Sequence, residues 1–128
     1  MLILYSLSVI LLIAFKLWWD IKAKNSGRVI NHTTSAVIDT LLYFFVATVI
    51  IRVTTDDYDN VKAFEWLLYG LLLRWNIFDI SWNVLNRMRW NYLGGYNTLD
   101  KLGKKIGHTI YYVIKLTILI ITMIWVIK

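Results

Sequence analysis

The sequence is dominated by three long apolar runs, at residues 2–19, 35–53 and 109–127. Each run contains no more than two charged residues, and the chain has no proline that would interrupt a helix. At a rise of 1.5 Å per residue, about 20 apolar residues cross the hydrocarbon core of a bilayer as a helix. We therefore predict an all-α integral membrane protein.

A fourth segment, residues 63–86, is apolar over only about half of a membrane-spanning length. The charges of the connections indicate whether it crosses. The connections after the first run and after this segment are basic, whereas the connection before this segment is acidic. Because basic loops remain in the cytoplasm, we expect four spans with the N-terminus and the C-terminus both outside. The basic residues are Lys22, Lys24, Arg28, Arg87, Arg89, Lys101, Lys104 and Lys105, and the acidic ones are Asp56, Asp57, Asp59 and Glu65.

The composition agrees with a membrane protein. Hydrophobic residues make up 59% of the chain and charged residues 17%, and there is no cysteine for a disulfide or a thiolate metal site. The net charge of +6 is explained by the basic connections, so no nucleic-acid partner is expected. The first run has no basic residues before it and no small-residue cleavage site after it, and we interpret it as a retained anchor. We expect one domain, residues 1–128, folded as a four-helix bundle in a bacterial inner membrane.

A row of polar residues lies along one face of the predicted third helix. Asn76, Asp79, Asn83 and Asn86 follow one another at i, i+3, i+7 and i+10. We call these four residues the polar stripe. Unpaired polar groups in hydrocarbon are unfavourable, so the stripe has to face other helices, another subunit or water. Two alternatives give the stripe a structural role, either as interhelical hydrogen-bonding groups or as residues that emerge into the headgroups.

Charged residues inside the spans suggest two ion pairs. Asp79 and Lys115 are predicted at one depth, and Lys16 and Asp39 at another. The alternatives are that the lysines extend toward the headgroups and that Asp39 interacts with the dipole at a helix start. Arg74 has no predicted partner in the chain, because it lies on a different helix face from Asp79. We expect it to bind Asp79 of another copy, a carboxylate of another protein or a lipid phosphate.

The last connection contains an amphipathic segment, at about residues 98–107. Its apolar residues Leu99, Leu102 and Ile106 are spaced as on one face of a helix, after Gly94-Gly95, which we expect to end the third span. The segment is predicted to lie in the membrane interface. The residues expected to contact anionic headgroups are Arg87, Arg89, Lys101, Lys104 and Lys105.

The functional hypothesis is a non-enzymatic membrane protein that acts as an oligomeric assembly. Arg74 and the polar stripe would lie at the contact between subunits, or they would line a small pore or ion path, as in a membrane-permeabilising device. One alternative is an accessory subunit of a larger membrane complex. Another is an enzyme that modifies lipid headgroups through Asp79, Arg87 and Asp100. His32 and His108, near Asp20 and Asp100, do not have the spacing of metal ligands on one helix, and no cofactor is expected.

A motif-level resemblance covers residues 74–102. The run RWNIFDISWNVLNRMRWNYLGGYNTLDKL is similar to a pattern in uncharacterised small membrane proteins of Bacteroidetes-type bacteria and their phages. The pattern is an aromatic-rich R-W…F-D…N-L helix followed by Y-(L/I)-G and a W/L-D-(K/R) element. The resemblance implies that this stretch is a structural unit and implies no activity. The matching residues are Arg74, Trp75, Phe78, Asp79, Asn83, Leu85, Tyr92, Leu93, Gly94 and Asp100.

Overall fold

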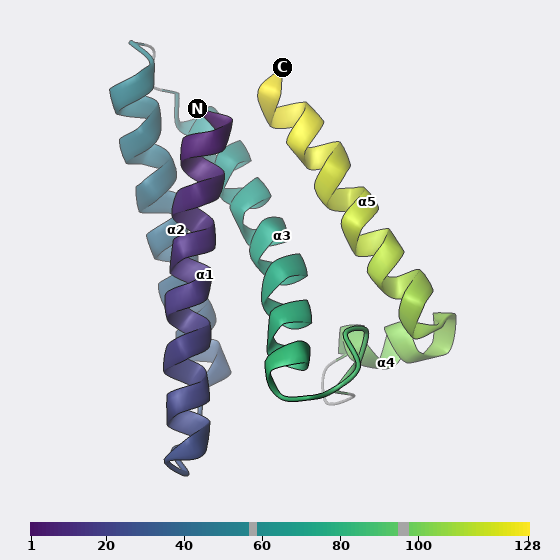
Figure 1. Cartoon of the computed structure of the whole chain (residues 1–128). Helices are drawn as coiled ribbons and strands as arrows, with labels where there is room; N and C mark the ends of the chain where they lie inside the picture. Colours follow the sequence, from purple (N-terminus) through teal and green to yellow (C-terminus); the bar gives the residue numbers. More distant parts are fainter. Residues whose placement is uncertain (57–58, 95–97) are drawn as a thin grey trace.

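The structure, a computed structural model, describes residues 1–56, 59–94 and 98–128, apart from the side chain of His32. Within these residues the chain forms five α-helices and no strand, which confirms the predicted all-α class. Figure 1 shows their order along the chain. The helices are α1 (Leu2–Asn25), α2 (His32–Thr54), α3 (Asn60–Leu85), α4 (Thr98–Ile106) and α5 (His108–Ile127).

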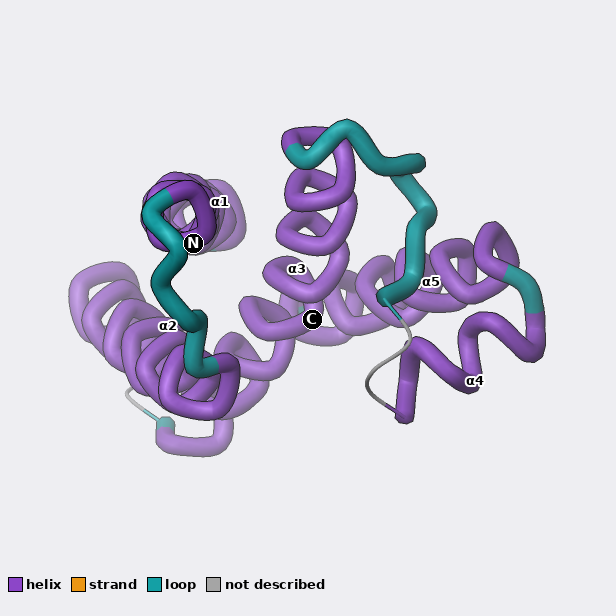
Figure 2. The backbone as a smooth tube through the Cα atoms, turned by 90° about the horizontal axis from the view of Figure 1, so that it is seen from below, coloured by secondary structure: helices purple, strands orange, loops and turns teal. Residues whose placement is uncertain are grey.

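The four long helices alternate in direction, and the short helix α4 lies across one end of α3 and α5 (Figure 1). Both chain termini lie at the opposite end. Helix α3 packs against α1, α2 and α5, and the view along the helices shows it between the α1–α2 pair and α5 (Figure 2). Among the described residues, α5 has no comparable contact with α1 or α2. The long helices are therefore arranged as one central helix with three neighbours.

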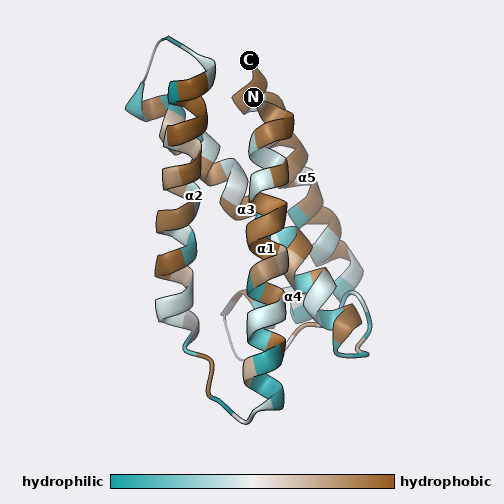
Figure 3. Cartoon of the chain, turned by 60° about the vertical axis from the view of Figure 1, so that its left-hand side comes forward, coloured by the Kyte–Doolittle hydropathy of each residue, from teal (hydrophilic) through white to brown (hydrophobic). Residues whose placement is uncertain are grey.

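Three helices are long and apolar enough to cross a membrane: α1, residues Thr33–Thr54 of α2, and α5. Hydrophobic residues extend along these helices, whereas hydrophilic residues gather toward the lower end of α1 (Figure 3). Helix α3 does not meet this criterion, although it has 26 residues and is long enough to span. Its composition is more polar because three apolar helices cover much of its surface.

The helix starts are set by local capping. The side chain of Asn31 accepts a hydrogen bond from the backbone N–H of Thr34 at 3.1 Å, so α2 begins at residue 32, before the predicted start at 35. The side chain of Asp59 caps α3 in the same way, accepting from the N–H of Val61 at 2.8 Å. Capping by a polar side chain thus extends both helices beyond their apolar runs.

The end of α3 differs from the prediction. The helix ends at Leu85, and Arg87 adopts the left-handed conformation with φ of 58°. The N–H of Met88 then donates to the carbonyl of Asn83 at 2.8 Å, as in a Schellman-type helix end. The prediction that Gly94-Gly95 ends this helix was wrong, because an arginine occupies the position that glycine usually takes. Gly95 itself lies outside the described residues.

An aromatic cluster joins α1 to α3 at the end near the termini. Tyr5 is buried, and its ring contacts Trp66 edge to face with 5.3 Å between centroids. Tyr69 closes the cluster, and its hydroxyl lies 2.9 Å from the Oγ of Ser6. Gly70 permits this close approach, since a Cβ atom at this position would lie 2.3 Å from the hydroxyl oxygen of Tyr5.

We expect Gly70→Ala to destabilise the protein, although alanine is the better helix former by about 1 kcal/mol. The buried Tyr5 ring has to shift, and overpacking of this kind usually costs about 1 to 3 kcal/mol. Unfolding by SDS titration in mixed micelles, followed by circular dichroism, measures the change. Tyr5→Phe should restore part of the loss because it removes the nearest atom. A Gly70→Ala protein as stable as the wild type would show that the helices do not approach this closely.

Candidate functional site

The polar stripe faces the interior of the chain. Asn76 and Asn83 are both buried. The Nδ2 of Asn76 donates to the carbonyl of Leu72 at 2.9 Å within α3 and to the carbonyl of Lys115 on α5 at 3.3 Å. The stripe thus lies against α5, and its first member forms a hydrogen bond between two helices.

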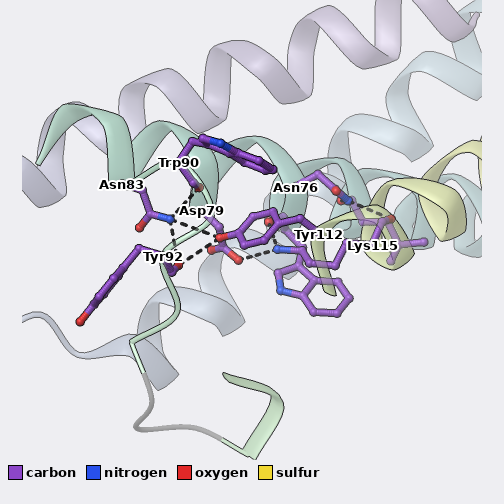
Figure 4. Close-up of polar contacts among 9 residues, drawn as sticks. Asn76, Asp79, Asn83, Trp90, Tyr92, Tyr112 and Lys115 are labelled. Atoms are coloured by element: carbon purple, nitrogen blue, oxygen red, sulfur yellow. Dashed lines mark hydrogen bonds and ion pairs between the residues drawn. The ribbon is translucent and has the colours of Figure 1, made fainter. Parts of the chain in front are cut away.

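Asn83 holds the segment that follows α3. Its Nδ2 lies 3.0 Å from the carbonyls of Trp90 and Tyr92 and 3.2 Å from the hydroxyl of Tyr112 on α5 (Figure 4). That hydroxyl in turn donates to the carbonyl of Tyr92 at 3.3 Å. One buried amide therefore connects the end of α3, the chain after it and the first turns of α5.

Asp79 and Lys115 form the predicted ion pair. The Nζ of Lys115 lies 2.6 Å from the Oδ2 of Asp79 and donates to the carbonyl of Trp75 at 2.9 Å (Figure 4). The same ammonium lies over three aromatic rings, 4.5 Å from the centroid of Trp75, 4.8 Å from that of Tyr112 and 5.6 Å from that of Tyr111. The charge is thus stabilised by a carboxylate, a carbonyl and an aromatic cage.

The two partners of this pair differ in exposure. The side chain of Lys115 is 1% exposed, whereas that of Asp79 is 38% exposed. The lysine is enclosed by its own chain, whereas more than a third of the aspartate side chain is exposed beside the contact between α3 and α5. Asp79 is therefore a charged member of the polar stripe that is partly exposed, as the amide of Asn86 also is.

Arg74 is paired within the chain, so the prediction that its partner lies elsewhere was wrong. Its Nε lies 2.7 Å from the Oδ2 of Asp39 on α2. Its guanidinium also lies 4.9 Å from the ring centroid of Phe78. Only Asp79 had been considered as a partner within the chain, whereas the long arginine side chain reaches Asp39 once α2 and α3 pack together.

The predicted pair of Lys16 with Asp39 is also wrong. Lys16 pairs with Asp20 one turn along α1, and both side chains are largely buried. An i, i+4 pair within one helix needs no particular packing of a second helix, and Asp39 is already bound by Arg74. The neighbouring helices α1 and α2 therefore carry two separate ion pairs at this depth.

The last member of the polar stripe connects α3 to α1. The carbonyl oxygen of the Asn86 side chain accepts a hydrogen bond from Lys24, and its Nδ2 donates to the carbonyl of Trp82 at 2.8 Å. The ammonium of Lys24 also lies 5.6 Å from the ring centroid of Trp82. Lys24 had been assigned to the basic connection, and only the packing of α1 on α3 gives it this partner.

Helix α4 is anchored at Gly103. A Cβ atom there would lie 2.7 Å from Leu93 and 2.9 Å from Tyr111, so glycine allows α4 to lie close to both. The apolar residues Leu99 and Leu102 are exposed beside the lysines. The residues predicted to contact lipid headgroups are all exposed at this end of the molecule, but their lipid contact stays a prediction. They are Arg87, Arg89, Lys101, Lys104 and Lys105.

The residues considered for metal binding are not brought together. Asp20 pairs with Lys16, and the side chain of His32 is outside what the structure describes. His108 begins α5 and is half-buried. Over the described ranges, no group of three His, Cys, Asp or Glu side chains is close enough to hold a metal ion.

The aromatic cage was not predicted, although the sequence contains a signal for it. Tyr111 and Tyr112 precede Lys115 by four and three residues and therefore lie on its face of α5. Trp75 similarly precedes Asp79 by four residues on α3. Lys115 and Asp79 each follow an aromatic residue by one helical turn. This spacing is the sequence signal for the two sides of the site.

The sequence matches no protein-family model and no curated protein, and the fold matches no solved structure. The resemblance of residues 74–102 to small membrane proteins of Bacteroidetes-type bacteria and their phages stays a prediction.

Asp79→Asn should destabilise the protein more than Lys115→Met. The first change leaves an enclosed ammonium without its counter-charge, for which we expect a loss of about 3 kcal/mol. The second leaves a carboxylate that remains partly exposed and places an apolar side chain in the aromatic cage, for which we expect a loss of about 1 kcal/mol. SDS titrations of the two variants measure the difference. The reverse order would show that the carboxylate is the more enclosed partner.

A double-mutant cycle with Arg74→Ala and Asp39→Ala should give a coupling free energy of about 1 kcal/mol or more, because the two side chains form a partly buried ion pair. The matched control is the cycle with Lys16→Ala and Asp39→Ala, in which we expect little coupling because these residues are not paired. Coupling in the control cycle alone would contradict the observed pairing.

Proposed function

We propose that the protein is a non-enzymatic integral membrane protein with four spans that works as an oligomeric assembly, with the subunit contact at the open side of the α3–α5 pair. The observation that carries this proposal is the exposure of Asp79. It is a charged group on a central helix, and its side chain is 38% exposed although it is paired with Lys115. An intramembrane ionisable group of this kind favours a functional or assembly role.

The remaining polar groups support a structural role for the rest of the stripe. Asn76, Asn83 and Asn86 donate their amide hydrogens to acceptors in the chain, and Arg74 is paired with Asp39. Groups engaged in this way are not free to line a water-filled path without breaking those contacts. We therefore assign the assembly contact to the exposed side chain of Asp79.

The contacts that Lys115 already makes within the chain also favour a binding role over a catalytic one. The ammonium of Lys115 already has a carboxylate, a carbonyl and three aromatic rings around it, and these contacts leave no open side for a substrate. A lysine that acts as a base or nucleophile needs a free lone pair. The alternative of a headgroup-modifying enzyme receives less support from this geometry than the assembly does.

We propose further that α3 crosses the membrane and that both termini lie outside. Both basic connections lie at one end of the molecule and the termini at the other (Figure 1). This separation of charge satisfies the positive-inside rule and fits a bacterial inner membrane. Helix α4, with its exposed leucines and lysines, would then lie in the cytoplasmic interface.

The alternative proposal is an accessory subunit, in which the open side of Asp79 meets a different membrane protein. The two proposals use the same surface and differ in the mass of the complex. Native mass spectrometry of the tagged protein, extracted in mild detergent, separates them. An assembly of this chain alone should appear as one multimeric species, and an accessory subunit as a complex with a second chain.

Neutralising the open pair should abolish the assembly. The double variant Asp79→Asn/Lys115→Met removes both charges, so it leaves no enclosed ion unpaired. We expect it to be monomeric by native mass spectrometry. The matched control, Asp39→Asn/Arg74→Met, neutralises the pair that lies away from the proposed contact, and it should assemble as the wild type does. Assembly that survives the first change, or that is lost equally in both, would contradict the proposed contact.

A further inference from the structure

A cleft lies between α1 and α2, at the end where residues 26–31 connect them. Its volume is about 670 Å³, which is within the range of small-molecule binding sites. One part of its lining is apolar and belongs to the two helices, with Leu12, Phe15 and Ile38 among the residues. The other part is polar and lies toward the connection. The lining of the cleft thus changes from apolar to polar along the helices toward the connection.

The charges that line the cleft do not cancel. Three cationic side chains, Lys16, Lys22 and Arg28, and two carboxylates, Asp20 and Asp39, belong to the lining. Asp20 is bound by Lys16, and Asp39 is bound by Arg74, which is outside the lining. Lys22 and Arg28 therefore remain as the surplus charge of the cleft.

Both surplus cations are available. Lys22 and Arg28 are exposed, and Arg28 has no ion pair with any residue in the part of the chain that the structure describes. Lys22 lies 5.1 Å from the ring centroid of Trp18, a contact that leaves its ammonium hydrogens free to donate. Both side chains line the cleft and can donate to an anionic group.

The apolar part is open to the surroundings of α1 and α2, which are two of the helices able to span a membrane. Phe15 and Ile38 are exposed to more than half of their surface. Val29, in the connection beside the cations, is 95% exposed, which fits a position in the membrane interface and not in bulk water. The cleft therefore offers an apolar wall at hydrocarbon depth and two cations at headgroup depth.

We propose that this cleft binds one anionic phospholipid, with its phosphate between Lys22 and Arg28 and an acyl chain along the apolar wall. The inference rests on the membrane orientation proposed above and is independent of the proposed assembly contact. It is a separate site from the basic surface of α4, because it combines two cations with the apolar wall of a cleft between two helices. A zwitterionic lipid would lack the net charge that complements the two surplus cations.

Native mass spectrometry with added lipid tests the site. The full chain in mild detergent is mixed with phosphatidylglycerol or with phosphatidylcholine, and bound lipids are counted by mass. We expect one phosphatidylglycerol per chain to be retained and phosphatidylcholine to be lost. Each basic residue near an anionic lipid changes binding about fivefold, so Lys22→Gln/Arg28→Gln should weaken retention about 25-fold.

Two further variants distinguish a seated lipid from general attraction. Lys104→Gln/Lys105→Gln removes the same charge from α4 and should retain the lipid as the wild type does. Ile38→Trp keeps both cations but fills the apolar wall, and it should lose the lipid. Circular dichroism verifies that each variant is folded.

Four outcomes would each overturn the proposal. The lipid could be lost equally from Lys22→Gln/Arg28→Gln and Lys104→Gln/Lys105→Gln, or it could be fully retained by Ile38→Trp. Phosphatidylcholine could be retained as well as phosphatidylglycerol, or inorganic phosphate alone could displace the lipid. The same spectra report the number of chains. A monomer that retains the lipid would refute the proposed assembly and leave the lipid site in place.

Discussion

The structure depends on one constraint: the polar side chains of α3 have to find partners among three apolar neighbours. Helix α5 supplies Lys115, α2 supplies Asp39, and α1 supplies Lys24. Each neighbour thus carries a polar group at the level where α3 requires one. Apolar packing brings helices together without a preferred rotation, whereas these directed contacts select one rotation and one depth for each helix. The arrangement around a central helix follows from this requirement.

The two proposed sites, at Asp79 and in the cleft between α1 and α2, lie at surfaces that the helix packing leaves exposed. The Asp79 side chain binds Lys115 within the chain and is 38% exposed, and among the described residues α5 has its main long-helix contact with α3. The cleft between α1 and α2 is open because these helices are held mainly through α3 and carry separate ion pairs. Helix α5 and the α1–α2 pair lie on different sides of α3 (Figure 2), so the two proposed contacts involve different neighbours of the central helix.

The depth of a charged residue along its helix predicts only some of the ion pairs that the structure contains. Asp79 and Lys115 were predicted correctly, since both lie on the facing surfaces of adjacent antiparallel helices. Lys16 and Asp39 share a depth but bind other partners, one within its own helix and one across to α3. Depth restricts the candidates, but the rotation of each helix and the length of the side chain decide between them.

Hydropathy and charge along the chain were sufficient for the helical class, the three apolar helices and a polar stripe that has to avoid lipid, because these follow from the helical period and from the exclusion of polar groups from hydrocarbon. The partner of Arg74, the aromatic cage around Lys115 and the exposure of Asp79 were decided only by the tertiary structure. Each depends on which faces of two helices meet, and that choice is made by contacts summed over the whole interface. Gly70 and Gly103 are examples of this dependence. The sequence shows that both are glycines, but only the packed structure shows which side chains lie against them.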